Sequence, residues 1–317
     1  MTRPRRSCLS VPGSSPKMLG KAPSLPADEV FMDLEDSVAP LAKEEARGNV
    51  VQALKEGDWT GKTVVVRVNG VYTKWCHRDV AEIVESAGEL VDCIMIPKVE
   101  YASDVVFVAN LLRMIEDTIG LEKRIGLEVQ IETALGLKNI NEIAAASDRI
   151  EDLILGPADM SASLGLPTVT AGAPIPGYEG LDHWHHVLVT INIAARAHSL
   201  QCIDGPYLLI HDLDGFRVAA MRARALGYDG KWAIHPGQVE ILNEVFTPTQ
   251  EEYDKAEAML DAYRHATEVE LLGAVMFGNE MIDEASRKMA EQLAARGRAA
   301  GLSRTKTLED FQKEFSS

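Results

Sequence analysis

The sequence contains few cysteines and no pairing pattern among them. None of the four lies in a CxxC motif or in a cluster with histidine. Small domains that are held together by disulfides carry cysteines at a much higher density. We therefore expect reduced thiols in the core of a cytoplasmic protein. The four are Cys8, Cys76, Cys93 and Cys202.

The sequence also lacks a long apolar run near its start. The basic opening, MTRPRRSCLS, is followed by no apolar stretch long enough for a signal peptide or a membrane-spanning helix. We therefore expect neither secretion nor membrane insertion.

Excess positive charge is missing as well. Lys and Arg number 32 against 48 Asp and Glu, so the formal net charge is −16. Binding to a phosphate backbone draws on clustered Lys and Arg, so we expect no nucleic-acid partner. A small anionic ligand needs only a local basic patch, and one candidate lies near the start of the chain. It comprises Arg3, Arg5, Arg6, Lys17 and Lys21.

Eight strand-like runs alternate with stretches of helical spacing. No GxGxxG follows the first run and no phosphate-binding P-loop occurs, which disfavours nucleotide-binding folds. Polar residues gather at the carboxyl ends of most runs, so we expect a (β/α)₈ barrel rather than an open doubly wound sheet. The expected strands are Arg6–Val11, Val30–Glu35, Thr63–Asn69, Val91–Val99, Ile125–Glu132, Leu153–Leu155, Gln201–Tyr207 and Tyr228–Ile234.

The barrel is expected to span residues 1–246, followed by a helical extension over residues 247–317. Thr247-Pro-Thr-Gln-Glu carries capping residues for a helix to about Thr267. A Gly-Asn turn interrupts the pattern before a second helix over roughly Glu284 to Arg296. We expect this extension to act as a lid or as an arm between subunits.

The fifth expected strand has one apolar and one polar face. Leu127, Val129 and Ile131 alternate with three polar residues, Glu128, Gln130 and Glu132. Because successive side chains of a strand point to opposite faces, the polar set is expected to line the interior of the barrel.

Two carboxylates at neighbouring strand ends predict a metal site. Glu132 and Asp159 lie 27 residues apart, about the length of a strand–helix–strand repeat. Mg²⁺ typically takes one or two protein carboxylates and completes its octahedron with water and substrate oxygens. The alternative for each residue alone is a helix cap or an ion pair with an arginine.

Other charged groups follow the neighbouring strands. Three carboxylates within four residues, in Asp33-Leu-Glu-Asp, repel one another unless a cation lies nearby. Arg67 could neutralise them, or it could hold an oxyanion. Lys98 could form a Schiff base, but we favour an ion pair because a Schiff-base lysine needs a lowered pKa. His183, His185 and His186 are expected on different sides of a helix rather than as a zinc ligand set.

Seven motifs resemble, in family order, those of the HpcH/HpaI aldolase and citrate lyase β-subunit superfamily, specifically its CoA-ester lyases. The resemblance covers about residues 6 to 290. It is strongest to malyl-CoA and β-methylmalyl-CoA lyases, because of the long insert before Trp184 and the closing Lys231-Trp-Ala-Ile-His-Pro. The motifs are Leu9-Ser-Val-Pro-Gly-Ser-Ser-Pro, Asp33-Leu-Glu-Asp-Ser-Val-Ala-Pro, Val66-Arg-Val-Asn, Met95-Ile-Pro-Lys-Val-Glu, Glu132-Thr-Ala-Leu-Gly, Gly156-Pro-Ala-Asp and Ile234-His-Pro-Gly-Gln.

The resemblance implies roles for particular residues. Glu132 and Asp159 would bind Mg²⁺, with Mn²⁺ as an alternative. Arg67 would contact the thioester and keto-acid oxygens, and the N–H groups of Ala158 and Asp159 would receive the keto-acid carboxylate. Glu35 and Asp36 would act near the metal, through water or by orienting Arg67.

The resemblance also implies where CoA and a second subunit lie. CoA would contact Lys17, Lys21, His235 and Pro236. Asp283 would enter a neighbouring subunit's site and exchange a proton with the acyl carbon, which implies a homotrimer or a homohexamer. The implied reaction splits L-malyl-CoA or β-methylmalyl-CoA into glyoxylate and acetyl-CoA or propionyl-CoA.

Several alternatives stay open from the sequence. The scaffold could serve a citramalyl-CoA lyase that forms pyruvate, a malyl-CoA thioesterase, or a citrate lyase β-like subunit of a larger complex. A CoA-independent pyruvate aldolase would leave the basic N-terminal loop unused. A CoA-ester-binding regulator is the alternative outside catalysis.

Overall fold

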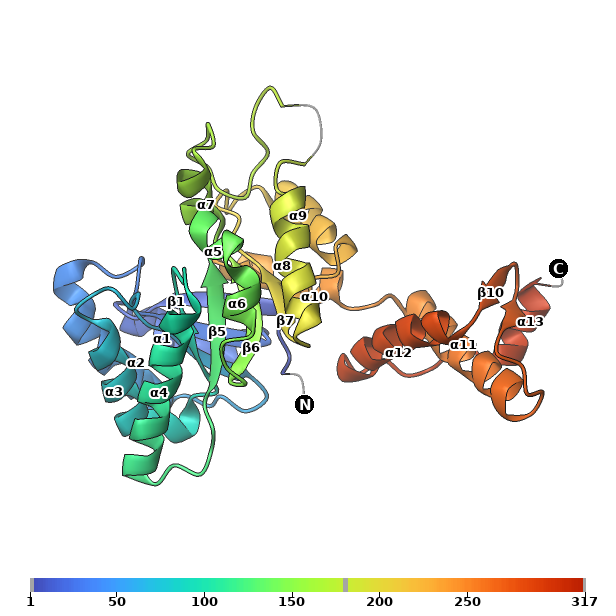
Figure 1. The fold of residues 1–317 in the computed structure, drawn as a ribbon, viewed down its shortest axis with the longest axis horizontal. Helices are drawn as coiled ribbons and strands as arrows, with labels where there is room; N and C mark the ends of the chain where they lie inside the picture. The colour runs from blue at the N-terminus through green and yellow to red at the C-terminus, as the bar shows by residue number, and fades with distance from the viewer. Residues whose placement is uncertain (1–2, 179–181, 316–317) are drawn as a thin grey trace. The chain divides into compact units, whose positions relative to one another are not determined.

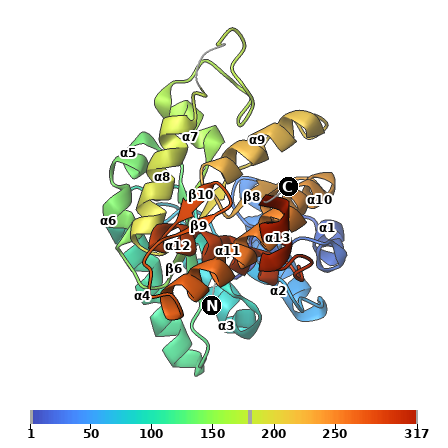
Figure 2. The same ribbon diagram turned by 90° about the vertical axis from the view of Figure 1, so that its right-hand side faces the viewer.

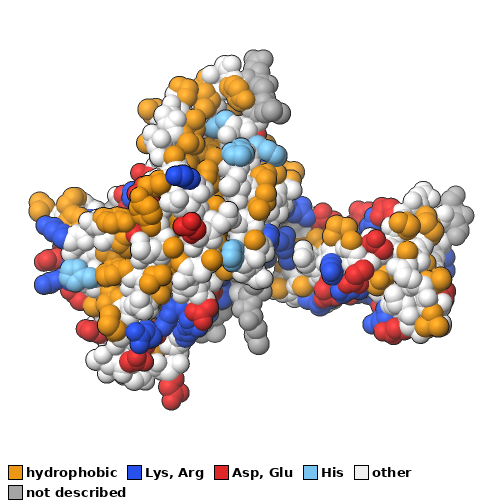
Figure 3. Space-filling model, viewed as in Figure 1, with side chains coloured by type: hydrophobic (Ala, Val, Ile, Leu, Met, Phe, Trp, Pro, Cys, Tyr) orange, Lys and Arg blue, Asp and Glu red, His pale blue; other side chains and the backbone are white. Residues whose placement is uncertain are grey.

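The computed structural model describes residues 3–178 and 182–315, and these divide into two compact units. The first comprises Met1–Phe246 and the second Thr247–Ser317. Each unit has its own hydrophobic clusters. No helix within the described ranges is both long and apolar enough to cross a membrane. Charged side chains of both signs lie on the surface of each unit (Figure 3).

The first unit is a closed barrel of parallel strands in the order β1 to β8, with β8 paired to β1 (Figure 1). This confirms the expected (β/α)₈ fold and excludes the open sheet. All eight strands lie where the sequence predicted them, with ends that differ by a few residues. They are β1 Ser7–Pro12, β2 Glu29–Asp33, β3 Thr63–Arg67, β4 Cys93–Ile96, β5 Gly126–Ile131, β6 Ile150–Leu155, β7 Gln201–Asp204 and β8 Gly230–Ala233.

Helices connect the strands and cover the outside of the barrel. The fifth strand confirms the expected alternation, since Leu127, Val129 and Ile131 belong to the outer hydrophobic core while Glu128 and Gln130 are buried in the interior. The α-helices are α1 Pro16–Lys21, α2 Lys43–Glu56, α3 Cys76–Ala87, α4 Ala102–Ile119, α5 Ala134–Lys138, α6 Ile140–Ala144, α7 Pro157–Leu164, α8 His185–Ala197, α9 Leu213–Ala225 and α10 Val239–Phe246.

A layer of apolar side chains crosses the interior of the barrel. Strands β1 to β4 and β6 to β8 contribute to it, and every member is buried. It separates a polar group at the amino ends of the strands, here called the base, from another at the carboxyl ends, here called the mouth. The layer consists of Cys8, Phe31, Val65, Cys93, Met95, Ile154, Ile203 and Trp232.

The second unit contains helices α11 Gln250–Glu268, α12 Glu284–Ala299 and α13 Leu308–Phe315, with a hairpin of β9 Val275–Phe277 and β10 Glu280–Ile282 (Figure 2). The first helix begins as expected, because Thr249 and Glu252 form a reciprocal capping box. The sequence did not predict α13, whose Phe311 packs with Tyr263, Phe277 and Ile282.

Candidate active site at the mouth of the barrel

A bidentate ion pair joins the ends of β2 and β3. Asp33 and Arg67 are register partners, and the distances are 2.7 Å from Nε to Oδ1 and 2.8 Å from Nη2 to Oδ2. Burial alone would raise the pKa of Asp33, but Arg67 outweighs it and lowers that pKa to about 2. The guanidinium also lies 5.9 Å and 5.2 Å from the ring centroids of Phe31 and Trp232. Arg67 is therefore a fixed positive charge.

The third nitrogen of Arg67 faces the mouth. Its Nη1 lies 3.4 Å from Gln130 Oε1 and 3.4 Å from Glu35 Oε2. Asp33 also holds the loop after β2, because its oxygens accept hydrogen bonds from the N–H groups of Glu35 and Ser37 at 2.8 and 3.1 Å. Arg67 and this acidic loop are thus ordered by the same carboxylate.

Lys98 joins the remaining carboxylates of the mouth. Its Nζ forms ion pairs with Glu35, with Asp36 Oδ2 at 3.0 Å and with Asp159 Oδ2 at 3.3 Å. Burial would lower the pKa of Lys98, but Glu132 and Glu35 outweigh it and the pKa is raised. This geometry favours the ion-pairing interpretation over the Schiff base, which needs the opposite shift.

Glu132 and Asp159 are brought to the same lysine. The backbone N–H of Lys98 donates to Glu132 Oε1 at 2.8 Å, while its Nζ contacts Asp159. Burial raises the pKa of Glu132 to about 7, although Lys98 and Arg67 partly offset that effect. Asp159 belongs to the first turn of α7, and its side chain is 38% exposed.

The donor set suits a hard divalent cation. Glu132 and Asp159 supply carboxylate oxygens, which Mg²⁺ and Mn²⁺ prefer, and such ions complete their coordination with water or substrate oxygens. A cationic group, the Lys98 ammonium, already contacts Asp159 there. The residues present therefore fit the predicted metal.

Gly156 fixes the position of Glu132. A Cβ at residue 156 would lie 2.3 Å from Glu132 Oε2, so the carboxylate occupies space that only glycine leaves open. We expect Gly156→Ala to displace Glu132 and to weaken Mn²⁺ binding by roughly tenfold or more, as measured by calorimetric titration. The matched control is Gly48→Ala in α2, where an added Cβ meets nothing within 4 Å. Unchanged affinity in Gly156→Ala would remove Glu132 from the ligand set.

The amino end of α7 presents backbone donors beside the metal pair. Ala158 and Asp159 lie in the first turn, after Pro157, where N–H groups have no partner within the helix. Such groups and the helix dipole together attract anions. A carboxylate ligand could therefore bind at this helix end.

The predicted CoA residues follow β1 and β8, which are neighbours in the barrel. Lys17 and Lys21 lie on α1, and His235 and Pro236 lie directly after β8. All four are exposed. His235 Nδ1 accepts the N–H of Gly237 at 3.1 Å, which orders this loop.

Asp283 lies in the second unit, where it caps α12. Its Oδ1 accepts hydrogen bonds from the N–H groups of Ala285 and Ser286 at 2.9 and 3.1 Å. These bonds, that of Ser286 first, lower the pKa of Asp283.

The expected basic patch near the start of the chain was wrong in three of its five residues. Arg5 does not share a patch with Lys17, because it precedes β1 and is buried at the base, while Lys17 follows β1. Arg3 and Arg6 are also engaged at the base, with Glu151 and Asp28. The proposed patch for a small anion is therefore reduced to Lys17 and Lys21.

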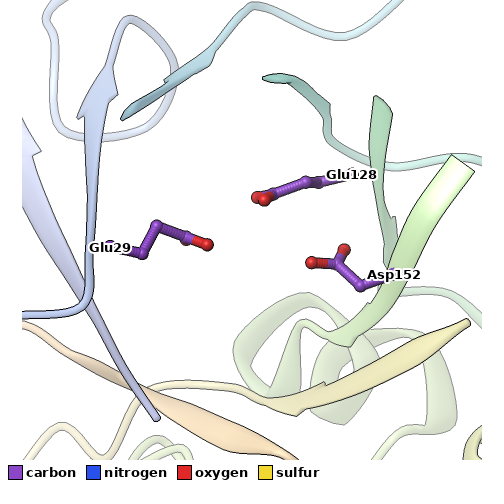
Figure 4. Close-up of side chains that lie close together, drawn as sticks. All are labelled: Glu29, Glu128 and Asp152. Carbon is purple, nitrogen blue, oxygen red and sulfur yellow. The ribbon is translucent and has the colours of Figure 1, made fainter. Parts of the chain in front are cut away.

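The base holds a second acidic cluster, formed by Glu29, Glu128 and Asp152 (Figure 4). Their ligand atoms lie within 4.8 Å of one another, as they would around a metal ion. The Arg5 guanidinium lies among them instead, with Nε 3.0 Å from Glu29 and Nη2 2.9 Å from Glu128. Burial raises the pKa of Glu29 and of Asp152 well above their usual ranges. This cluster therefore already holds an internal cation, the Arg5 guanidinium.

Sequence reasoning missed the contribution of Lys43 to the mouth, and it did not predict the contact of Gln130 with Arg67. Lys43, from α2, donates to the carbonyl oxygens of Leu34 and Glu35 at 2.9 Å each. The clustering of acidic residues after β2 was a signal for a cationic partner, but two cations from distant segments, Arg67 and Lys98, satisfy it.

Comparison with known proteins identifies a shared family model and close relatives. Residues 6–236 match the HpcH/HpaI aldolase/citrate lyase family. The chain is 41% identical over 306 residues to the L-malyl-CoA/β-methylmalyl-CoA lyase of Rhodobacter capsulatus, covering 94% of this chain and 96% of that protein. It is 36% identical to a (3S)-malyl-CoA thioesterase of Cereibacter sphaeroides, covering 93% and 97%.

Solved structures give a related result. The crystal structure of CitE from Mycobacterium tuberculosis, in complex with magnesium, acetoacetate and coenzyme A, is similar with a TM-score of 0.74. The two chains are 28% identical, and the match covers 93% of this chain and 98% of that one.

Proposed function

Because the chain belongs to the HpcH/HpaI aldolase/citrate lyase family, we propose that it is a carbon–carbon lyase acting on CoA thioesters. Its substrate is L-malyl-CoA or β-methylmalyl-CoA, and its products are glyoxylate and acetyl-CoA or propionyl-CoA. The observation that supports this most is the convergence of Arg67, Glu132 and Asp159 around one barrel mouth. The R. capsulatus relative supports the substrate class.

The reaction needs stabilised negative charge at two points. Cleavage takes a proton from the 3-hydroxyl group, breaks the C–C bond to release the keto acid, and leaves a thioester enolate that must be protonated. Mg²⁺ held by Glu132 and Asp159, or Mn²⁺ in its place, supplies Lewis-acid polarisation of the keto-acid oxygens when bound. Arg67 offers fixed charge through Nη1, because its Nε and Nη2 donate to Asp33.

The remaining residues orient the substrate. The N–H groups of Ala158 and Asp159 hold the carboxylate of the keto acid at the start of α7. Lys17, Lys21 and the His235–Pro236 loop contact CoA, where positive side chains can meet its phosphates. Glu35 and Asp36 keep Lys98 and Arg67 in place.

Asp283 acts as the acid and base at the acyl carbon. In the condensation direction its carboxylate takes a proton from acetyl-CoA, and in cleavage the protonated carboxyl group returns one to the thioester enolate. One carboxylate oxygen, Oδ1, accepts the capping bonds of α12 and leaves Oδ2 for the substrate. We propose that Asp283 serves a neighbouring subunit, in a homotrimer or homohexamer, and that the protein is cytoplasmic, as its four thiol cysteines suggest.

The test is glyoxylate-dependent consumption of acetyl-CoA and propionyl-CoA by the purified protein. We expect turnover with Mg²⁺, none with EDTA, and a loss of at least about tenfold in Asp159→Asn. Turnover that survives both changes would overturn the metal-dependent mechanism.

Two further measurements separate the alternatives. Pyruvate in place of glyoxylate tests citramalyl-CoA chemistry. Release of free CoA and malate from malyl-CoA, without glyoxylate, tests the thioesterase activity that the C. sphaeroides relative suggests. CoA-ester binding without turnover of any substrate would leave a regulatory role.

A further inference from the structure

The Lys98 ammonium contacts three carboxylates from two segments of the mouth. It forms ion pairs with Glu35 and Asp36 after β2 and with Asp159 in α7. The side chain of Lys98 is 34% exposed, and that of Glu35 is only 8% exposed. An ordinary surface ion pair joins two exposed side chains, whereas this ammonium is shared among three carboxylates, one of which, Glu35, is buried.

The backbone of Lys98 adds a second connection. Its φ of 53° lies in the left-handed region, which is unfavourable for a side chain of this kind. That conformation accompanies the hydrogen bond from its N–H to Glu132 Oε1 at 2.8 Å. Backbone strain of this type persists where the surrounding structure fixes it, often at functional sites. One residue thus binds both predicted metal ligands, Glu132 through its N–H and Asp159 through its ammonium.

These contacts place the ammonium and a divalent cation in competition. Both require the Asp159 carboxylate, and two cations sharing it would repel each other in a partly buried site. The ammonium has two other partners, Glu35 and Asp36, to which it can remain bound when it leaves Asp159.

We infer that Lys98 is an exchangeable internal counter-ion for the metal site: it neutralises Asp159 in the metal-free protein and withdraws to Glu35 and Asp36 when the metal binds. This inference rests on the proposed metal site. It makes Lys98 a positioning residue, whose N–H orients Glu132 and whose charge limits metal affinity.

The test is direct Mn²⁺ binding by calorimetry to the full-length protein without substrate. Replacing Lys98 with methionine keeps the aliphatic stem and the backbone N–H but removes the charge. We expect the Kd for Mn²⁺ to fall by roughly tenfold in Lys98→Met, and the difference to shrink at high salt. Lys98→Arg, which keeps the charge, should bind no more tightly than the wild type.

Lys123→Met is the matched control. Lys123 also pairs with a carboxylate, Asp92, at 3.2 Å, but these residues precede β5 and β4 and therefore lie at the base. This control should leave the Kd unchanged. If Lys98→Met binds Mn²⁺ with unchanged or weaker affinity, the counter-ion role is wrong. If the wild type binds no Mn²⁺ at all, it is the proposed metal site that fails.

A second variant serves if Lys98→Met does not fold. Asp36 is 60% exposed, so Asp36→Asn is expected to fold, and it removes one of the two partners that retain the ammonium. We expect it to weaken Mn²⁺ binding about threefold in the wild-type background and to have no effect in a Lys98→Gln background. Equal weakening in both backgrounds would mean that Asp36 acts on the metal without Lys98, and would overturn the exchange. An unchanged Kd for Asp36→Asn in the wild type would overturn it as well.

Discussion

Arg67→Met is expected to lower kcat by roughly a hundred- to a thousandfold and to destabilise the barrel by about 3–5 kcal/mol. The catalytic loss follows because a fixed donor aimed at developing negative charge is removed. The loss of stability follows because Asp33 is fully buried and would lose the guanidinium that compensates its charge. Steady-state kinetics and urea unfolding measure the two effects separately.

The double variant Arg67→Met with Asp33→Asn separates catalysis from stability. Asp33→Asn removes the buried carboxylate that has lost its partner, so it should recover most of the unfolding free energy while activity stays low. Recovery of activity together with stability would show that Arg67 only neutralises Asp33. In that case the cation of the mouth would be structural, as the sequence also allowed.

The pH dependence of Arg67→Met provides a further check on the same pair. In the wild type the pKa of Asp33 is lowered to about 2, so its stabilising contribution is present above the unfolded pKa of 3.8 and is lost as pH falls towards 2. In the variant, burial without Arg67 raises that pKa, so the folded state binds the proton more tightly and gains stability as pH falls. The difference in unfolding free energy should therefore narrow between pH 7.5 and pH 5.

The second large effect is expected at the base. Arg5→Met should destabilise the protein by about 3–5 kcal/mol, because Glu29, Glu128 and Asp152 are almost completely buried and Arg5 is the cation among them. Several of their oxygens already have no hydrogen-bond partner. Urea unfolding measures the loss, and kcat per folded molecule should stay close to the wild-type value.

This cluster should also make the unfolding free energy of the wild type depend on pH. The folded-state pKa values of Glu29 and Asp152 are raised, so the folded state binds more protons than the unfolded state above about pH 4. Stability therefore falls as pH rises through that window. Glu29→Gln keeps the shape and removes one titrating group, so it should flatten this slope. A slope that is the same in Glu29→Gln would mean that the cluster does not hold the protons.

The strands could be predicted from the sequence because they are apolar runs separated by stretches of helical spacing. In the fifth strand the apolar residues also alternate with polar ones, since successive side chains point to the helices and to the polar interior in turn. The prediction was less accurate at the ends of the strands. The apolar run from Val91 to Val99 predicted a long fourth strand, whereas β4 ends at Ile96 and Lys98 takes a left-handed conformation. Val99 is still buried, so hydrophobicity continues where the strand pairing has stopped.

The prediction of the mouth residues used a simpler rule, namely that polar residues that follow parallel strands meet at one end of a barrel. Glu132, Asp159 and Arg67 follow that rule. The contact of Lys98 with both metal candidates does not, because neither a positive φ in lysine nor the reach of its side chain can be read from spacing. The error over Arg5 has a related cause: six residues of β1, about 20 Å of extended chain, carry it away from Lys17.

The apolar layer between the base and the mouth has a consequence for how such a barrel can change over time. The apolar layer, which includes Phe31, Met95, Ile154 and Trp232, separates the charged cluster at the base from the charged residues at the mouth. The first cluster stabilises the fold, and the second is suited to chemistry. The changes in stability caused by substitutions at the base should therefore add to those caused by substitutions at the mouth. A lineage can adjust the acyl or keto-acid preference at the mouth while the ionic anchor at the base continues to keep the molecule folded.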